Sequence, residues 1–362
     1  FYRWLHLVPA PHNAHVLAGL ILQCFFFGAG LAMADQWIRR PLFIPLALLA
    51  TTIHLTLAGS AFIDIWPPHV LLMPFFCFMV GAASVAAGRI RHLPLTVLAG
   101  CFLVHGHVAQ PLYVVPLFLL AYRLAWRRAR RQPGGVGAWL RDHRAVHFVS
   151  VGCIALFLVP FVIDLCAGAS SNLARIVEFE SYPHPGKALW RALLFFCAFF
   201  GYVQKTEIYL SVWGPDRAAT IGEHASGYFV WAAIIIIVLF RAWRPRPGPA
   251  APERPFVLSL IAFTALAFLL SLYWGTIQIA KMYAYNGYFF YAILECILLL
   301  LCAAISTLKV PVPALVGALL CTGATAFAWQ RQYVPLGLNY TNNEIPLAVR
   351  RAVNSDPRPV AP

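Results

Sequence analysis

The sequence predicts an all-α, polytopic integral membrane protein with about 10–11 transmembrane helices, a fold class that follows from two observations. Of the 362 residues, 61% are hydrophobic and only 11% are charged, whereas a soluble domain carries roughly 25% charged residues. The apolar residues also fall into repeated blocks of about 16 to 22 residues, the length that crosses a bilayer core as a helix.

Ten apolar blocks are the candidate spans, and several have tryptophan or tyrosine near their ends, as interfacial aromatic belts do. The blocks cover roughly residues 14–34, 42–58, 69–88, 93–108, 110–126, 147–166, 225–242, 256–274, 287–306 and 311–329. Residues 1–329 thus form a transmembrane helical domain. Residues 330–362 turn polar and are expected to begin an outer, periplasmic segment.

Basic residues orient these spans, because an excess of Lys and Arg marks cytoplasmic loops. They stand in short loops between apolar blocks, at Arg39, Arg40, Arg89, Arg91, 127–131, Arg141, Arg144, 241–255 and Lys309. With these loops inside, the outer segments are 1–13, 59–68, 105–111, 167–224, 275–286 and 330–362. This distribution explains the net charge of +14 without a nucleic-acid partner. Nine cysteines without a CxxC pair predict packing thiols.

Two segments depart from single crossings. Residues 93–126 would reach about 51 Å as one helix against a hydrocarbon core of roughly 30 Å, and basic residues flank both ends. A helical hairpin with a polar tip at 105–111 is therefore predicted. The apolar block 188–203 is expected to lie along the outer interface or to re-enter, because a full crossing would place the basic loop 241–255 outside.

The hairpin tip holds the first candidate site residues, His105, His107 and Gln110. Irregular polar backbone at this depth survives only where protein buries it or where it faces a watery cavity. The two histidines are two residues apart and so point to opposite sides, which argues against a two-histidine metal chelate. Two interpretations stay open: these side chains satisfy loop backbone groups, or they contact a substrate.

Further candidates stand in the other outer segments. Asp64, Trp66 and His69 surround a Pro-Pro turn, and Asp64 is either a site carboxylate or an ordinary interfacial acid. Ser170 or Ser171 is expected to cap a short helix that carries Asn172 and Arg175. A helix N-terminus with an arginine nearby suits a phosphate.

The rim of the last outer loop adds a cation and an aromatic residue, Lys281 and Tyr285. Lys281 is either the partner of a lipid phosphate or a lysine that snorkels to the interface. Glu295 lies inside a predicted span and is a functional candidate by default, since charges are costly there.

These residues, taken in order, resemble bacterial membrane glycosyltransferases of the GT-C superfamily. "IDIWPPHVLLMPF" is similar to the Trp-x-Pro-His turn that precedes a span in that family, matching at Trp66, Pro68 and His69. "LVHGHVAQP" resembles the tip of the next hairpin, with His105-Gly106 where Gln-Thr is common. "SSNLARIVEF" resembles a Gly-Asn-Leu loop, matching at Asn172 and Leu173. "YNGYFFYAIL" resembles a late Tyr-rich span, and the tail with "DPRPV" resembles the entry to a periplasmic C-terminal domain.

The resemblance implies transfer of a sugar, with inversion, from a polyprenyl-phosphate donor to a glycan or lipid acceptor of the cell envelope. The site would face the periplasm from the bacterial plasma (inner) membrane. Family members use a carboxylate of the first outer loop as general base, often with a divalent cation (Mg or Mn). That loop is expected upstream of Phe1, so the chain would lack its first span and its C-terminal soluble domain. Asp64 is the remaining acid to carry the role.

Three rival functions stay open. A transporter or lipid flippase would place polar groups at the bilayer midplane, often in two related halves. A membrane O-acyltransferase would use a buried histidine as base, and a scaffold subunit would need no base at all.

Overall fold

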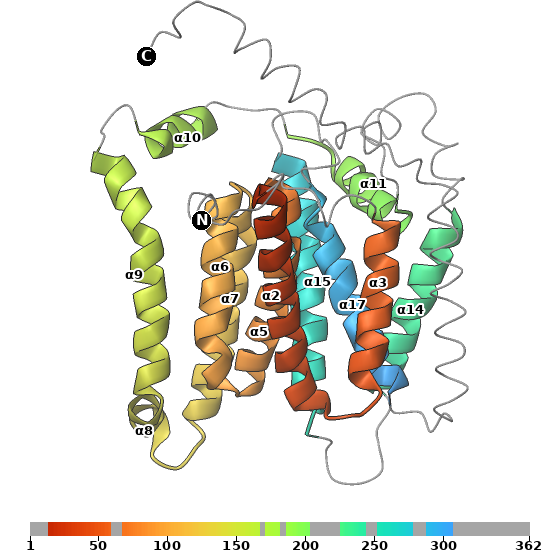
Figure 1. The fold of residues 1–362 in the computed structure, drawn as a ribbon, viewed down its shortest axis with the longest axis horizontal. Helices are drawn as coiled ribbons and strands as arrows, with labels where there is room; N and C mark the ends of the chain where they lie inside the picture. The colour runs from red at the N-terminus through yellow and green to blue at the C-terminus, as the bar shows by residue number, and fades with distance from the viewer. Residues whose placement is uncertain are drawn as a thin grey trace, which may run out of the picture. The chain divides into compact units, whose positions relative to one another are not determined.

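The computed structural model describes residues 14–58, 67–166, 171–181, 186–202, 225–243, 252–277 and 287–306. The chain divides into two compact units, residues 1–311 and 312–362, and all described residues belong to the first. Regular secondary structure in the described residues is entirely helical, which confirms the all-α prediction. The helices of Figure 1 are α2 (Ala14–Ile38), α3 (Phe43–Leu57), α4 (Pro67–Val70), α5 (Leu72–Ala87), η2 (Ile90–His92), α6 (Leu93–Gly106), α7 (Gln110–Ala129), α8 (Gly135–Asp142), α9 (Arg144–Cys166), α10 (Asn172–Ser181), α11 (Leu189–Phe200), α14 (Ala225–Trp243), α15 (Arg254–Ile277) and α17 (Phe290–Ile305).

Three of these helices are long and apolar enough to cross a membrane: α2 over Leu17–Ile38, α9 and α15. The other apolar helices are shorter, and they include α3, α5 and α17. The membrane character predicted from composition is thus supported at the level of single helices.

The centre of the bundle is α5, whose residues Leu72–Ala87 are all buried. Helices α2, α6, α7, α15 and α17 pack around it (Figure 1). Small residues allow these close approaches: a Cβ atom at Gly81 would collide with Thr96 of α6, and one at Gly30 would lie 2.7 Å from the Phe76 ring. Gly88 ends α5 with a φ of 115°, a conformation that favours glycine.

The predicted hairpin is confirmed in α6 and α7, which are joined by three residues around Val108. Pro111 occupies the first turn of α7, where the missing N–H costs nothing. The tip packs closely against the start of α5, because a Cβ atom at Gly106 would lie 2.5 Å from Leu71.

Two other predictions need correction in detail. The span expected over 69–88 is divided into α4 and α5, and Pro67 and Pro68 open α4 instead of forming a turn. Proline fits there because N–H groups in the first helical turn have no intrahelical partner. The basic segment after α7 contains a further helix, α8, that was not predicted.

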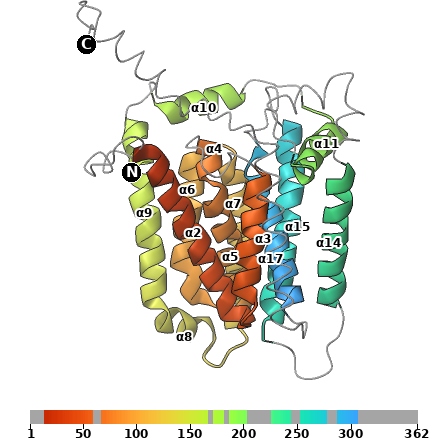
Figure 2. The ribbon, with the colours of Figure 1, turned by 45° about the vertical axis from the view of Figure 1, so that its right-hand side comes forward.

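Helix α11 has 12 residues, a length of about 18 Å, well short of a roughly 30 Å hydrocarbon core. It therefore agrees with the prediction that this block does not cross fully. Figure 2 shows α4, α10 and α11 at one end of the bundle and α8 at the other. We call the end with α4, the hairpin tip and the start of α17 the polar end. The opposite end, with Arg127–Arg131, is the arginine end.

Candidate functional site

Three chain segments converge at the polar end: α4, the hairpin tip and the start of α17. The His69 ring lies 4.2 Å from the Tyr288 ring, centroid to centroid. Nearby, Tyr113 of α7 lies 5.6 Å from Phe75 of α5 and 4.9 Å from Phe289, which immediately precedes α17. We call this second group, Phe75, Tyr113 and Phe289, the aromatic floor.

Gln110 lies one helical turn from Tyr113, just above the aromatic floor. Its side chain is 1% exposed, and within the described residues its Oε1 atom accepts no hydrogen bond. A buried acceptor left unpaired costs about 1–3 kcal/mol. We call Gln110, His69 and Tyr288, which lie at the same end of the bundle, the polar layer.

His107 satisfies the backbone of the tip. Its Nδ1 atom accepts a hydrogen bond from the Ala109 N–H at 3.1 Å, and its carbonyl accepts one from the Gln110 N–H at 3.0 Å. Burial lowers the pKa of this imidazole, which keeps Nδ1 unprotonated and able to accept. Of the two interpretations left open, the structure supports the loop-capping one for His107.

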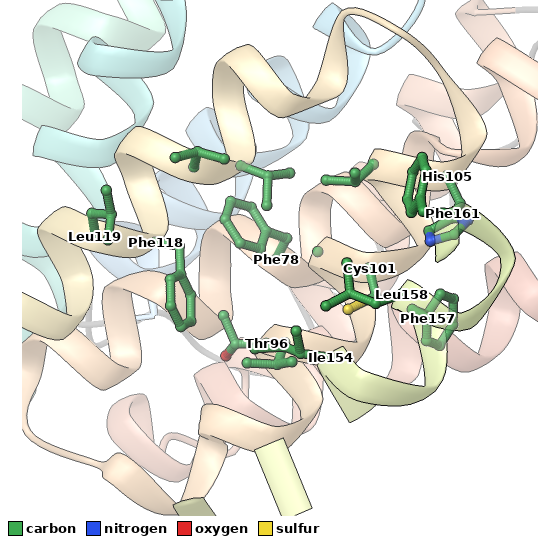
Figure 3. A pocket seen from close by; sticks show the side chains of 15 residues that line it. Phe78, Thr96, Cys101, His105, Phe118, Leu119, Ile154, Phe157, Leu158 and Phe161 are labelled. Atoms are coloured by element: carbon green, nitrogen blue, oxygen red, sulfur yellow. The ribbon is translucent and has the colours of Figure 1, made fainter. Parts of the chain in front are cut away.

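His105 points away from the tip, toward α9. Its ring lies 4.5 Å from the Phe161 ring and 5.3 Å from the Phe157 ring (Figure 3). The two tip histidines therefore diverge, as their spacing predicted, and they share no ligand.

The predicted short helix after α9 is present as α10. The Ala174 N–H donates to Ser171 Oγ at 3.0 Å, so Ser171 is the N-cap. Asn172 begins the helix, and Arg175 is exposed on it. Four candidate residues, Asp64, Trp66, Lys281 and Tyr285, lie outside the described residues.

A second polar group lies between α3 and α17, and sequence reasoning found only part of it. Thr51 donates to Glu295 Oε1, and Oε2 of this carboxyl group, which is 1% exposed, has no partner within the described part of the chain. One turn away, His54 contacts the Tyr202 hydroxyl at 2.8 Å and the Tyr291 carbonyl at 3.0 Å. In the sequence, the feature that could have drawn attention to Thr51 and His54 is their spacing of three residues, which places two polar side chains on one face of an apolar helix.

These contacts define the protonation of His54. The Tyr291 carbonyl can only accept, so Nε2 carries the proton and Nδ1 accepts from the Tyr202 hydroxyl. We call Thr51, His54, Tyr202, Tyr291 and Glu295 the α3–α17 cluster. Its side chains come from α3, from α17 and from Tyr202, which follows α11.

Within residues 14–306, as far as they are described, no group of three or more His, Cys, Asp or Glu side chains could hold a metal ion. Comparison of the chain with protein-family models, with curated proteins and with solved structures gave no match.

Proposed function

We propose that the chain is a polytopic membrane protein whose arginine end faces the cytoplasm and whose polar end faces the periplasm. Three long apolar helices and the low charge content support its insertion. The arginines of α7 and α8 at one end, with the polar layer at the other, support this orientation.

Within that placement, the protein is an inverting glycosyltransferase of the GT-C type. It transfers a sugar from a polyprenyl-phosphate donor to a glycan or lipid acceptor. The observation that carries the proposal is the unpaired Gln110 oxygen in the polar layer. In this proposal a sugar hydroxyl donates to it, and the sugar packs beside the ring pair of His69 and Tyr288.

The chemistry requires a base, a phosphate partner and a dry site. A carboxylate takes the proton of the acceptor hydroxyl, whose oxygen bonds to the anomeric carbon as the bond to the lipid phosphate breaks on the opposite face. Asp64 is the proposed base. Lys281 or Arg175 stabilises the departing phosphate, and burial keeps water from the donor.

Trp66, Tyr285 and Asn172 are proposed as further substrate contacts on the strength of the resemblance. The divalent cation rests on the resemblance alone, because the described residues include no cluster suited to it.

The test is a transfer assay with the purified full chain and a panel of radiolabelled polyprenyl-phosphate sugars. We expect Gln110→Met to reduce transfer about tenfold or more, the equivalent of one lost hydrogen bond of about 1.4 kcal/mol. Gln132→Met, an exposed glutamine at the arginine end, is the matched control and should keep full activity. Equal activity of both variants would remove the polar layer from the site. No transfer from any donor by the folded parent would end the proposal.

A second candidate function, proton-coupled transport, is favoured by the α3–α17 cluster. An acidic side chain buried in a span, with one oxygen unpaired, is typical of proton carriers. Glu295→Gln keeps the size of the side chain and cannot ionise. It would abolish transport and leave sugar transfer unchanged, which separates the two functions.

A further inference from the structure

A cavity outside the polar layer lies between α6, α7 and α9, with a volume of about 250 Å³. Phe78 and Gly100 form its floor, Val115 and Leu119 line it from α7, and Ile154 lines it from α9 (Figure 3). Gly100 helps to keep it open, since a Cβ atom there would lie 3.1 Å from Val114. We call this cavity the α7–α9 groove.

The groove lies between two contacts that hold α9 against its neighbours. Toward the polar end, Phe157 lies 5.3 Å from Phe102 of α6. Toward the arginine end, His147 lies 5.0 Å from Trp139 and 6.1 Å from Tyr122. Between these contacts, α9 leaves the apolar faces of α6 and α7 open to the side.

The interior of the groove suits hydrocarbon and nothing polar. The Thr96 hydroxyl, one of the few polar groups in its lining, already donates to the His92 carbonyl at 2.8 Å. At the polar end of the groove the His105 ring packs against Phe157 and Phe161, and the residue is exposed. The α7 rim continues onto exposed apolar surface, with Leu119 60% exposed. The occupant therefore enters from the bilayer as a chain.

The charged end of the groove indicates what that chain is attached to. Val115, Leu119, Arg123 and Arg127 follow one another at intervals of four on α7, and all four are exposed. We call these four residues the stripe. Its side chains change from apolar to cationic within one turn, and Arg123 lies about 12 Å from Val115 along the helix.

The surroundings of this stripe match a membrane interface. Tyr122, Trp126 and Trp139 pack together with centroid distances of 6.1 to 6.2 Å. The only acid between residues 123 and 144 is Asp142, against the arginines at 123, 127, 128, 130, 131, 141 and 144. This excess of arginine favours an anionic headgroup. A zwitterionic headgroup would gain little, because Asp142 alone could pair with its cationic group.

We infer that the α7–α9 groove binds one anionic glycerophospholipid of the cytoplasmic leaflet, with an acyl chain in the groove and its phosphate against Arg123 and Arg127. The inference rests on the membrane orientation proposed above and not on sugar transfer. The chain of the sugar donor is a poorer occupant, because the proposed function places its phosphate at the polar end, whereas Arg123 and Arg127 lie toward the arginine end of α7.

The test uses the full chain purified in detergent, without any sugar donor. Native mass spectrometry counts bound phosphatidylglycerol and phosphatidylcholine, and phosphatidylglycerol with a photoreactive acyl chain locates the site by peptide mapping. We expect one retained phosphatidylglycerol, with cross-links in α7 and α9. Binding should weaken about 30-fold in the double variant Arg123→Gln/Arg127→Gln, since each arginine near an anionic phosphate contributes several-fold.

Matched variants separate this site from general lipid contact. Ile154→Trp fills the groove and should abolish the α9 cross-link, whereas Leu156→Trp, on the opposite side of α9 and 69% exposed, should leave it unchanged. Arg130→Gln/Arg131→Gln removes the same charge beyond the stripe and should weaken binding much less.

Several outcomes would overturn the inference: equal retention of phosphatidylcholine, cross-links spread evenly over the apolar helices, or displacement by glycerol phosphate alone. Preferential binding of a polyprenyl phosphate would reassign the groove to the donor. Retention of phosphatidylglycerol by a protein that transfers no sugar would uphold this inference while the proposed function failed.

Discussion

Two buried glutamines, Gln23 and Gln110, differ in whether their side-chain oxygen is paired. Gln23 accepts a hydrogen bond from the Met73 N–H at 3.3 Å, whereas Gln110 Oε1 has no partner among the described residues. Replacing Gln110 with methionine keeps its volume and removes an unsatisfied acceptor. We therefore expect Gln110→Met to stabilise the protein by about 1–3 kcal/mol while it impairs transfer, as thermal unfolding in detergent can measure.

Gln23→Met is the matched comparison and should destabilise, because it leaves the buried Met73 N–H without its acceptor. A loss of stability in both variants would mean that Gln110 is satisfied in the protein and is not held ready for a ligand.

The hydrogen bond from Thr51 to the Glu295 carboxyl group is expected to contribute to the stability of the protein. Thr51→Val removes the hydroxyl that donates to this buried carboxyl group, and we expect it to destabilise by about 1–3 kcal/mol. The double variant Thr51→Val/Glu295→Leu removes both partners and should recover most of that loss. The Thr264 hydroxyl donates to the Leu260 carbonyl of its own helix, so Thr264→Val should have little effect in the same unfolding measurement. A double variant less stable than Thr51→Val would show that Glu295 has other partners.

At the scale of helices, α2, α5 and η2 are joined at the arginine end through one serine. Ser84 Oγ accepts from Trp37 Nε1 at 2.7 Å and lies 2.7 Å from His92 Nδ1. His92 Nε2 lies 3.2 Å from Gln36 Oε1. An amide oxygen can only accept a hydrogen bond, so Nε2 carries the proton of the ring. In the neutral ring Ser84 therefore donates to Nδ1, an acceptor that protonation of His92 would remove.

This network predicts a loss of stability in mild acid. Burial, and then the nearby charges of Arg91 and Arg89, lower the pKa of His92 from 6.5 to about 4. Its contribution is therefore fully present above pH 6.5 and falls as the pH drops toward 4, because the unfolded chain binds the proton first. The midpoint of thermal unfolding should fall between pH 7 and pH 5, and less so in His92→Gln. An equal fall in both proteins would place the acid sensitivity elsewhere.

Helix positions could largely be predicted from the sequence, whereas contacts between helices could not. Block length and flanking arginines located α6 and α7, and excess length required their hairpin. Helix α8 was not predicted because eight residues are too few to show a helical period, and they lie in a basic segment. Glu295 stands out in any apolar block, but its partner Thr51 is 244 residues away, and no local pattern encodes which two helices meet. The polar layer likewise joins segments that only the folded chain brings together.

At the scale of the whole molecule, the two ends of α7 test the proposed orientation together. Val108, at the hairpin tip, is 64% exposed, and Gln132, just beyond the arginine end of the helix, is exposed as well. The 20 residues of α7 span about 30 Å, so these two positions belong on opposite sides of a bilayer. In intact bacterial cells, a membrane-impermeant maleimide should label Val108→Cys and spare Gln132→Cys.

Inverted membrane vesicles should give the reverse pattern, and the parent chain supplies the background from its own cysteines. Both halves of the result matter, because each excludes a different alternative. Labelling of both positions in intact cells would mean that α7 does not cross, which would remove the membrane placement on which sugar transfer and the lipid groove both depend. Labelling of Gln132→Cys alone would keep the crossing but invert it. The polar layer would then face the cytoplasm, and the phospholipid phosphate at Arg123 and Arg127 would have to come from the outer leaflet.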